Sequence, residues 1–380
     1  MINKVGLLNF KCFQDETVSF NSLTLLAGLN GMGKSTVFQA LLLLRQNYEL
    51  GLLKEDKGLL LNGELVQIGK GADVLYQYFE SNNVGIGLFL DDEMHASWWW
   101  EAKVDSESLP LKEKIISSDE VYKAALFGMD FHYLNAERLG PRVYSEVSNY
   151  NVINKNNIGL RGEYAASFLS QFQSSKIPIE NLRNPRTPSM GDTLLEQVNA
   201  WMSEIRLGTR VNVTSNLEMG LVGLNYQFVS DKDVSNKFRP TNVGFGLSFL
   251  LPIVVAILSS KPGALLLIEN PEAHLHPQGQ VRISELMAMA AANGIQIIVE
   301  THSDHILNGI RIAVKNGIIK PNKTALLFAG GKTEGDKFKH YIQSPKIDEN
   351  GRIDTWPDGF FDEWDKSLAN LISPSHPPQE

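Results

Sequence analysis

One motif in the chain has the residue types and spacing needed to bind phosphate. Residues 28–35 read GLNGMGKS and fit the pattern G-x-x-x-x-G-K-[ST]. The glycines let backbone amides turn around phosphate oxygens, Lys34 supplies a charge for the outer phosphates, and Ser35 supplies a hydroxyl for magnesium. Further residues expected at the bound nucleotide are Asn30, Gly31, Gly33 and Thr36. The alternative explanation of the motif is an ordinary glycine turn before a core helix.

A second segment, LLLIENPE, begins as an apolar run and has carboxylates at its end. Glu269 ends the run and is our candidate for the metal-side carboxylate, although aspartate is the usual residue at such a position. Asn270 follows, and its amide cannot accept a proton from an attacking water. Two catalytic explanations stay open: either Glu272 is the base, or Asn270 only orients water and turnover is slow. Glu272 could also be a structural carboxylate near a helix N-terminus.

Histidines lie in two places near these segments. His302 follows the apolar run GIQIIVE after one residue, so it would lie at the carboxyl edge of a parallel sheet, where open α/β folds bind ligands. It is therefore a candidate contact for a terminal phosphate. His274 and His276 are two residues apart and would not share a helix face, so we expect both to be structural rather than zinc ligands.

The order of the elements predicts an α/β fold with a parallel sheet at its centre. Strand-like VGLLNF, TVSF and LTLLAG precede the glycine motif, and STVFQALLLLRQNY after it predicts a buried helix. Later, ALLLIE and GIQIIVE indicate buried strands that alternate with helices. The WWW run at 98–100 predicts an aromatic strand packed against the body, with base stacking as the alternative.

Composition limits the classes of function. The net charge of −8 argues against a broad basic surface for nucleic acid and leaves room only for a local patch. The single cysteine, Cys12, excludes an intrachain disulfide and a four-cysteine zinc site. The most apolar stretch, 247–258, is shorter than the roughly 20 residues of a membrane helix, and residues 1–13 lack the pattern of a signal peptide. We therefore expect a cytoplasmic protein without a membrane segment.

Four segments in this order, GLNGMGKST, NVGFGLSFLLP, LLLIENPEAHLHP and IIVETHSDHIL, resemble the SMC-like and OLD-like ABC ATPases of bacteria. NFKCF and WPDGFF also resemble compact AAA-type members found in anti-phage defence loci. The resemblance implies an ABC-type P-loop ATPase head that binds ATP and Mg²⁺, with a mixed sheet, parallel core strands and flanking helices. It also implies that His302 is the switch histidine and Lys11 a basic residue near the nucleotide.

The resemblance further implies that NVGFGLS is the signature segment, which docks in trans onto ATP held by a partner head. Gly244, Gly246 and Ser248 are the candidates for this contact, although the segment differs from the usual Leu-Ser-Gly-Gly-Gln and could instead be a simple helix start. Asn270 stands where the family usually has a catalytic glutamate. The Q-loop glutamine stays open between Gln46 and Gln67.

These features predict four regions: an N-terminal part of the head (1–50), an inserted mixed and helical region (51–210), a C-terminal part (211–372) and a tail (373–380). No nuclease domain is expected. The function that we expect is a slowly hydrolysing ATPase that forms a homodimer around ATP and controls a DNA- or effector-directed activity in anti-phage defence. The first alternative is a hydrolysis-deficient scaffold or sensor for a separate nuclease, and the last is a nuclease in its own right.

Two arginines, Arg138 and Arg142, lie close together on an expected turn in NAERLGPR. Their guanidinium groups could reach a nucleotide or DNA phosphate through charge-assisted hydrogen bonds. The alternative is a salt bridge to Glu137 or another acid.

Overall fold

The central sheet confirms the expected α/β fold. The computed structural model describes residues 1–91, 93–216, 218–230, 232–361 and 363–372, so the expected tail at 373–380 lies outside the described residues. The sheet has six strands in the order β16-β15-β3-β14-β13-β9. All neighbours are parallel except β16, which pairs antiparallel with β15. The strands are β3 (Leu23–Gly28), β9 (Phe131–Leu134), β13 (Leu265–Glu269), β14 (Gln296–Glu300), β15 (Thr324–Glu334) and β16 (Lys337–Gln343).

The parallel strands are buried on both faces, which explains their continuous apolar sequences. In β13, Leu266 and Ile268 pack into one core, whereas Leu265 and Leu267 pack into the other. Because parallel strands end at the same edge, the last residues of β3, β13 and β14 come together there, and Glu269 pairs in register with Glu300.

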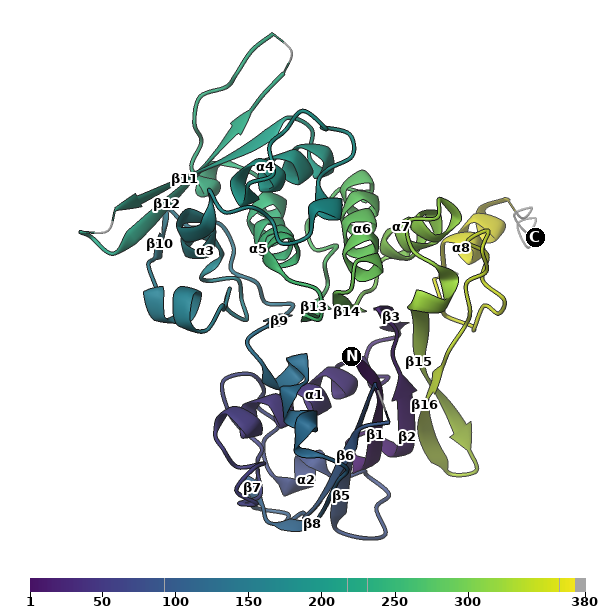
Figure 1. Ribbon diagram of the computed structural model, residues 1–380. Coiled ribbons are helices and arrows are strands. Elements are labelled where there is room, and N and C mark those ends of the chain that lie inside the picture. The colour runs from purple at the N-terminus through teal and green to yellow at the C-terminus, as the bar shows by residue number, and fades with distance from the viewer. Residues whose placement is uncertain (92, 217, 231, 362, 373–380) are drawn as a thin grey trace, which may run out of the picture.

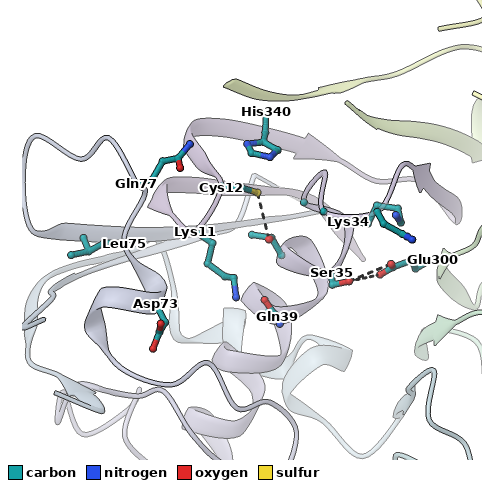
Figure 2. A pocket seen from close by; sticks show the side chains of 14 residues that line it. Lys11, Cys12, Lys34, Ser35, Gln39, Asp73, Leu75, Gln77, Glu300 and His340 are labelled. Atoms are coloured by element: carbon teal, nitrogen blue, oxygen red, sulfur yellow. Dashed lines mark hydrogen bonds between the residues drawn. The ribbon is translucent and has the colours of Figure 1, made fainter. Parts of the chain in front are cut away.

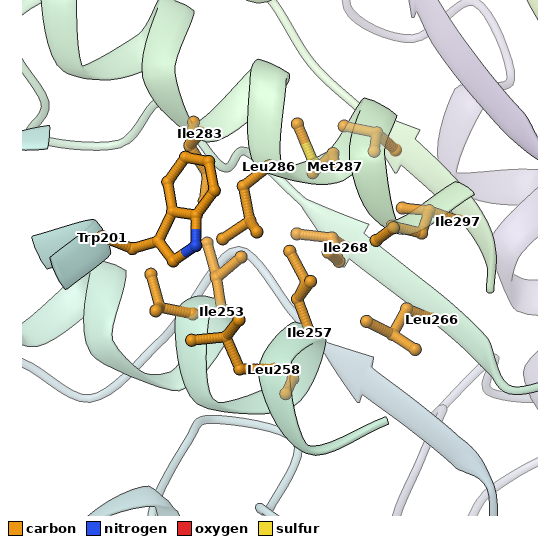
Figure 3. Close-up of a cluster of buried hydrophobic side chains, with 14 of the residues drawn as sticks. Trp201, Ile253, Ile257, Leu258, Leu266, Ile268, Ile283, Leu286, Met287 and Ile297 are labelled. Atoms are coloured by element: carbon orange, nitrogen blue, oxygen red, sulfur yellow. The ribbon is translucent and has the colours of Figure 1, made fainter. Parts of the chain in front are cut away.

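Helices lie on one side of the sheet, with α5 and α6 nearest to it and α3 and α4 outside them (Figure 1). They are α3 (Ala165–Phe172), α4 (Leu194–Ile205), α5 (Phe245–Ser259), α6 (Pro277–Ala292), α7 (Asp304–Lys315) and α8 (Glu363–Ile372). Figure 3 shows Trp201 of α4 among aliphatic side chains of α5 and α6, with Ile268 and Ile297 of the sheet beneath them. Trp201 is fully buried, and its indole N–H donates to the Leu182 carbonyl at 2.9 Å.

Helix α1 (Lys34–Glu49) lies between the other face of the central sheet and an antiparallel sheet (Figure 1). The antiparallel sheet has the order β2-β1-β5-β6-β8. Its strands are β1 (Ile2–Phe10), β2 (Phe13–Ser19), β5 (Asn83–Leu90), β6 (His95–Glu101) and β8 (Leu111–Ile116). Trp98 and Trp100 of β6 are fully buried, which confirms the prediction of an aromatic strand packed against the body.

Two smaller sheets complete the fold. A three-stranded sheet, β10-β12-β11, lies on the helical side and comprises β10 (Tyr144–Glu146), β12 (Leu221–Phe228) and β11 (Thr209–Asn216). A small sheet of β4 (Leu59–Leu60) and β7 (Ser108–Leu109), with helix α2 (Gly71–Val74), lies on the α1 side. Residues 51–210 are therefore shared between layers: β5, β6 and β8 extend the antiparallel sheet, β9 joins the central sheet, and α3 and α4 join the helical layer.

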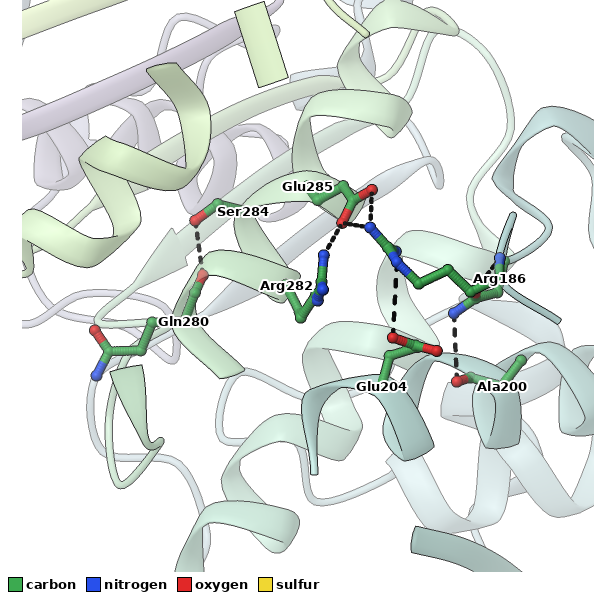
Figure 4. A network of polar contacts seen from close by, with 8 residues as sticks. Arg186, Ala200, Glu204, Gln280, Arg282, Ser284 and Glu285 are labelled. Atoms are coloured by element: carbon green, nitrogen blue, oxygen red, sulfur yellow. Dashed lines mark hydrogen bonds and ion pairs between the residues drawn. The ribbon is translucent and has the colours of Figure 1, made fainter. Parts of the chain in front are cut away.

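A polar network holds the segment before α4 against the helical layer (Figure 4). One guanidinium nitrogen of Arg186 lies 2.9 Å from both carboxylate oxygens of Glu285 in α6, and Arg282 also contacts Glu285 at 3.1 Å. Arg186 lies 3.8 Å from Glu204 of α4 as well. Because these groups are partly exposed, we expect the ion pairs to orient the segment and to contribute little to the free energy of folding.

The packing of Trp201 gives a prediction for stability. Trp201→Ala should lower the free energy of unfolding by about 3–5 kcal/mol, because it leaves a cavity between α4, α5 and α6 and removes the indole donor. Urea unfolding followed by circular dichroism measures this. Leu207→Ala is the control, since Leu207 is 93% exposed and its loss should change stability by less than about 0.5 kcal/mol. Equal midpoints for the two variants would contradict the prediction.

Candidate nucleotide-binding site

The glycine motif forms a tight loop between β3 and α1. Gly28 has φ of 138°, and a Cβ there would lie 2.2 Å from the carbonyl oxygen of Ala329 in the neighbouring strand. Gly33 has φ of 96°, and a Cβ there would meet Cys12 Sγ at 2.6 Å. Only glycine fits both the backbone angle and the close approach at these two positions. The loop therefore carries the α1 N-terminus to the sheet edge with its amides free of side-chain obstruction.

Lys34 is held inside the loop. Its ammonium donates to the carbonyl oxygens of Gly28 and Leu29 at 2.8 and 2.9 Å, and the residue is only 4% exposed. Burial lowers the pKa of Lys34, and the nearby Glu300 carboxylate partly opposes that shift. The positive charge of Lys34 thus lies at the loop that we expect to enclose the outer phosphates of a nucleotide.

A cavity of about 480 Å³ opens over the loop (Figure 2). The residues expected to contact the nucleotide all line it: Lys11, Asn30, Gly31, Gly33, Lys34, Ser35 and Thr36. Lys11 lies in the turn between β1 and β2, and burial lowers its pKa while Cys12 and Asp73 partly oppose the shift. The cavity also has lining residues that the sequence did not indicate, namely Cys12, Gln39, Asp73, Leu75, Gln77, Glu300 and His340.

Glu269 points toward β9. Its carboxylate accepts hydrogen bonds from the Tyr133 hydroxyl at 2.8 Å and the Ala136 amide at 2.9 Å. Burial and the adjacent Glu269 charge raise the pKa of Tyr133, so its hydroxyl stays a proton donor. Both carboxylate oxygens of Glu269 are therefore engaged on the side away from Ser35.

Glu300, the last residue of β14, points toward the P-loop (Figure 2). The Ser35 hydroxyl lies 3.3 and 3.2 Å from its two carboxylate oxygens. Burial, reinforced by the Glu269 charge, raises the pKa of Glu300 to about 7, while Lys34 and Ser35 act in the opposite direction. Sequence reasoning missed Glu300; the available signal was its place at the end of an apolar run, two residues before His302.

Glu272 supports the turn that carries His302. One of its carboxylate oxygens accepts from the Thr301 hydroxyl at 2.7 Å and the other from the His302 amide at 2.8 Å. Exposed His302 lies at a second cavity, of about 1040 Å³, whose wall includes Gly28, Leu29 and Asn30 on the other side of the P-loop. Partial desolvation of the imidazole at the cavity wall and the Lys34 charge lower the pKa of His302, which favours the neutral imidazole.

The Arg138 side chain holds the turn after β13 in place through hydrogen bonds to its carbonyls. Its guanidinium is 3% exposed and donates to the carbonyls of Asn135 at 3.0 Å and of Glu269 and Asn270 at 2.5 Å each. Burial lowers the pKa of Arg138 to about 10, so it stays charged at neutral pH. The guanidinium therefore binds backbone carbonyls inside the fold. The sequence had suggested two other partners for it, a ligand phosphate or a surface acid. Exposed Arg142 lies apart, at another cavity.

The three signature candidates lie at the start of α5. Gly244 caps the helix, is exposed, and has open space around its Cα. Gly246 packs against the turn after β13, because a Cβ there would lie 2.4 Å from the carbonyl oxygen of His274. The Ser248 hydroxyl is buried and points inward. Among the described residues lining the P-loop cavity, none comes from this segment.

Other candidates take structural positions. The Gln46 side chain bonds the Leu60 carbonyl and the Val66 amide, and Gln67 is exposed, so neither reaches the P-loop cavity. His274 packs against the rings of Phe245 and Phe249, while the His276 side chain caps α6. No cluster of three or more His, Cys, Asp or Glu side chains able to hold a metal occurs within the described ranges.

The described helices include none that is both long and apolar enough to cross a membrane.

Among curated proteins, none matches the sequence of this chain. Solved structures share its fold. An Smc head bound to the C-winged helix domain of ScpA aligns with a TM-score of 0.55 at 15% identity, covering 90% of this chain and 98% of that one. The Smc head domain with a coiled coil and joint from Pyrococcus yayanosii gives 0.53 at 10% identity, covering 97% and 99%.

Two sequence families match successive parts of the chain. A family described as "Protein of unknown function (DUF3696)" matches residues 319–371, which include β15, β16 and most of α8. The family described as "AAA domain, putative AbiEii toxin, Type IV TA system" matches residues 23–308, from the P-loop strand to the helix after His302. The chain therefore belongs to this AAA-domain family, and it has the fold of the Smc heads, as the resemblance in its sequence led us to expect.

Proposed function

We propose that this protein binds ATP with Mg²⁺ in the P-loop cavity, hydrolyses it slowly, and dimerises around it to control a DNA- or effector-directed activity. The observation that carries the proposal is the cavity itself, where Lys34, Ser35 and the glycine loop meet at the edge of the sheet. We also propose that this activity belongs to anti-phage defence, on the basis of the resemblance to compact AAA-type proteins of anti-phage loci.

To bind a phosphate, the Lys34 ammonium must exchange its present hydrogen-bond partners. The Lys34 ammonium now bonds two carbonyl oxygens of its own loop, and these neutral partners can be exchanged for the stronger attraction of a phosphate. The α1 N-terminus adds amides that point at the same place. Magnesium, when bound, would neutralise phosphate charge beside Ser35.

The groups near the attack site support slow turnover. Asn270 cannot accept a proton, and both Glu272 oxygens already hold the Thr301 and His302 donors. Asn270 has φ of 44°, and its amide N–H donates to the Glu300 carbonyl at 2.8 Å, so its backbone position is well defined. We propose that Asn270 orients water without activating it.

A second candidate function rests on the same observation. If the poorly activated water makes hydrolysis negligible, ATP acts as a lasting bridge, and the dimer is a scaffold or sensor for a separate effector such as a nuclease. The two candidates differ in turnover and agree in ATP binding.

The role of Lys34 gives the first test of this proposal. Lys34→Ala should weaken ATP binding by roughly 10- to 150-fold, because it removes a charge-assisted contact worth about 1.5–3 kcal/mol. Isothermal titration calorimetry with Mg²⁺-ATP measures the affinity. Lys4→Ala, on the exposed surface of β1, is the matched control and should bind ATP as the wild type does. Unchanged affinity in Lys34→Ala would contradict nucleotide binding at this cavity.

The role of Asn270 can be tested by restoring a carboxylate. Asn270→Glu should raise kcat by on the order of 100-fold, because a general base typically contributes about 10²–10⁴ in rate. Steady-state phosphate release measures turnover, with Glu272→Gln assayed in parallel. Loss of turnover in Glu272→Gln, with no gain in Asn270→Glu, would instead assign the base to Glu272.

Dimerisation can be tested at Gly244. Gly244→Arg should bind ATP normally but stay monomeric, because open space surrounds the Cα in one subunit while a bulky side chain would obstruct a partner docking there. Light scattering with Mg²⁺-ATP measures the mass. Met219→Arg, at an exposed turn between β11 and β12, is the control that should still dimerise. A Gly244→Arg variant that dimerises with ATP would rule out this segment as the interface.

A further inference from the structure

We propose that a cavity beside α5 binds a small α-amino acid in its zwitterionic form. This α5 cavity measures about 210 Å³ and is lined by residues of β10, α3, β12 and α5 and of the turns next to them. It is separate from the P-loop, because none of its described lining residues lines either of the two cavities there. Arg142 and Ser248, two sequence candidates that do not reach the P-loop cavity, meet in the α5 cavity.

The mouth of the α5 cavity carries two opposite charges that do not neutralise each other. Arg142 and Glu146 are both exposed, and both line the cavity. No ion pair joins them, and within the described ranges neither side chain has a hydrogen bond or ion pair to another residue. A zwitterion satisfies both groups, because its carboxylate pairs with the guanidinium while its ammonium pairs with Glu146. A ligand with a single charge leaves one of the two groups unpaired.

The wall that α5 contributes has polar groups without partners among the described residues. Pro252 lies inside this helix and has no N–H, so the Ser248 carbonyl lacks the i+4 donor of a regular helix. The Ser248 hydroxyl is also buried without a hydrogen-bond partner, as is the nearby hydroxyl of fully buried Tyr226. Because buried polar groups are nearly always bonded to protein, water or a ligand, this wall favours a polar occupant.

The volume and the remaining walls limit the ligand to a small molecule. At about 30 Å³ for each water molecule in the liquid, the cavity holds about seven waters or a ligand with a similar number of non-hydrogen atoms. Leu224 and Leu251 make its walls partly apolar. Gly162 has φ of 74°, and a Cβ there would lie 2.4 Å from Pro252 Cγ, so the turn before α3 stays in close contact with α5. L-Serine has this size, both charges for the mouth, and a hydroxyl that can donate to the Ser248 carbonyl.

Isothermal titration calorimetry of the full chain with L-serine tests the inference. Two analogues each lack one charge of serine: ethanolamine has no carboxylate, and 3-hydroxypropionate has no ammonium. L-Serine should bind with a dissociation constant of about 1 mM or lower, and both analogues should bind at least about tenfold more weakly, because each leaves one charged group of the mouth unpaired. No binding of L-serine at about 10 mM, or equal binding of either analogue, would overturn the proposal.

Two variants test whether L-serine binds at this mouth. Arg142→Gln and Glu146→Gln should each weaken L-serine binding at least about tenfold, since each removes one charge-assisted contact. Arg210→Gln and Glu218→Gln change exposed side chains outside the α5 cavity, so these matched controls should bind L-serine within about twofold of the wild type and melt at nearly the same temperature. Equal L-serine affinity in the wild type and the two mouth variants would place the binding elsewhere and overturn the assignment.

Discussion

Three glutamate side chains, Glu269, Glu272 and Glu300, meet at one edge of the central sheet, and the remainder of the site depends on how their charges are satisfied. Like charges this close must each find separate donors, or one of them must take up a proton. Glu269 is bound to the β9 side, Glu272 to the turn of His302, and Glu300 faces the Ser35 hydroxyl. The three carboxylates therefore diverge, and only one of them is left toward the nucleotide cavity.

Buried Arg138 compensates this negative edge without entering the cavity. Its guanidinium binds the carbonyls at the end of β13, and its plane lies over the ring of Phe249 in α5, 5.7 Å from the ring centroid. On the same side, the His274 carbonyl packs against Gly246. The turn that follows β13 is thus in direct contact with the start of α5.

Asn270 and Glu300 occupy adjacent strand ends and are joined through the backbone hydrogen bond from Asn270 to the Glu300 carbonyl. The chain thus lacks a carboxylate at the usual base position and has an additional one on the next strand.

Local sequence determined much of this protein. The phosphate loop is a contiguous motif, and apolar runs of strand and helix length predicted strands β3, β13 and β14 of the central sheet and helix α1. The predicted elements depend on neighbours within a few residues, so a pattern can show them. Lys34 and Ser35 were found in the same way, and both line the cavity as expected.

Tertiary structure decided which side chains face the cavity. Glu300 and Glu269 end similar apolar strands, and only the order β3-β14-β13 places one beside the P-loop and the other a strand further away. Arg138 has an equally ambiguous local sequence, since its role depends on carbonyls 131 and 132 residues away along the chain. The sequence determined which chemical groups are present, whereas the partners of each group were decided by strand order and long-range packing, because hydrogen bonds and burial depend on distance in space and not along the chain.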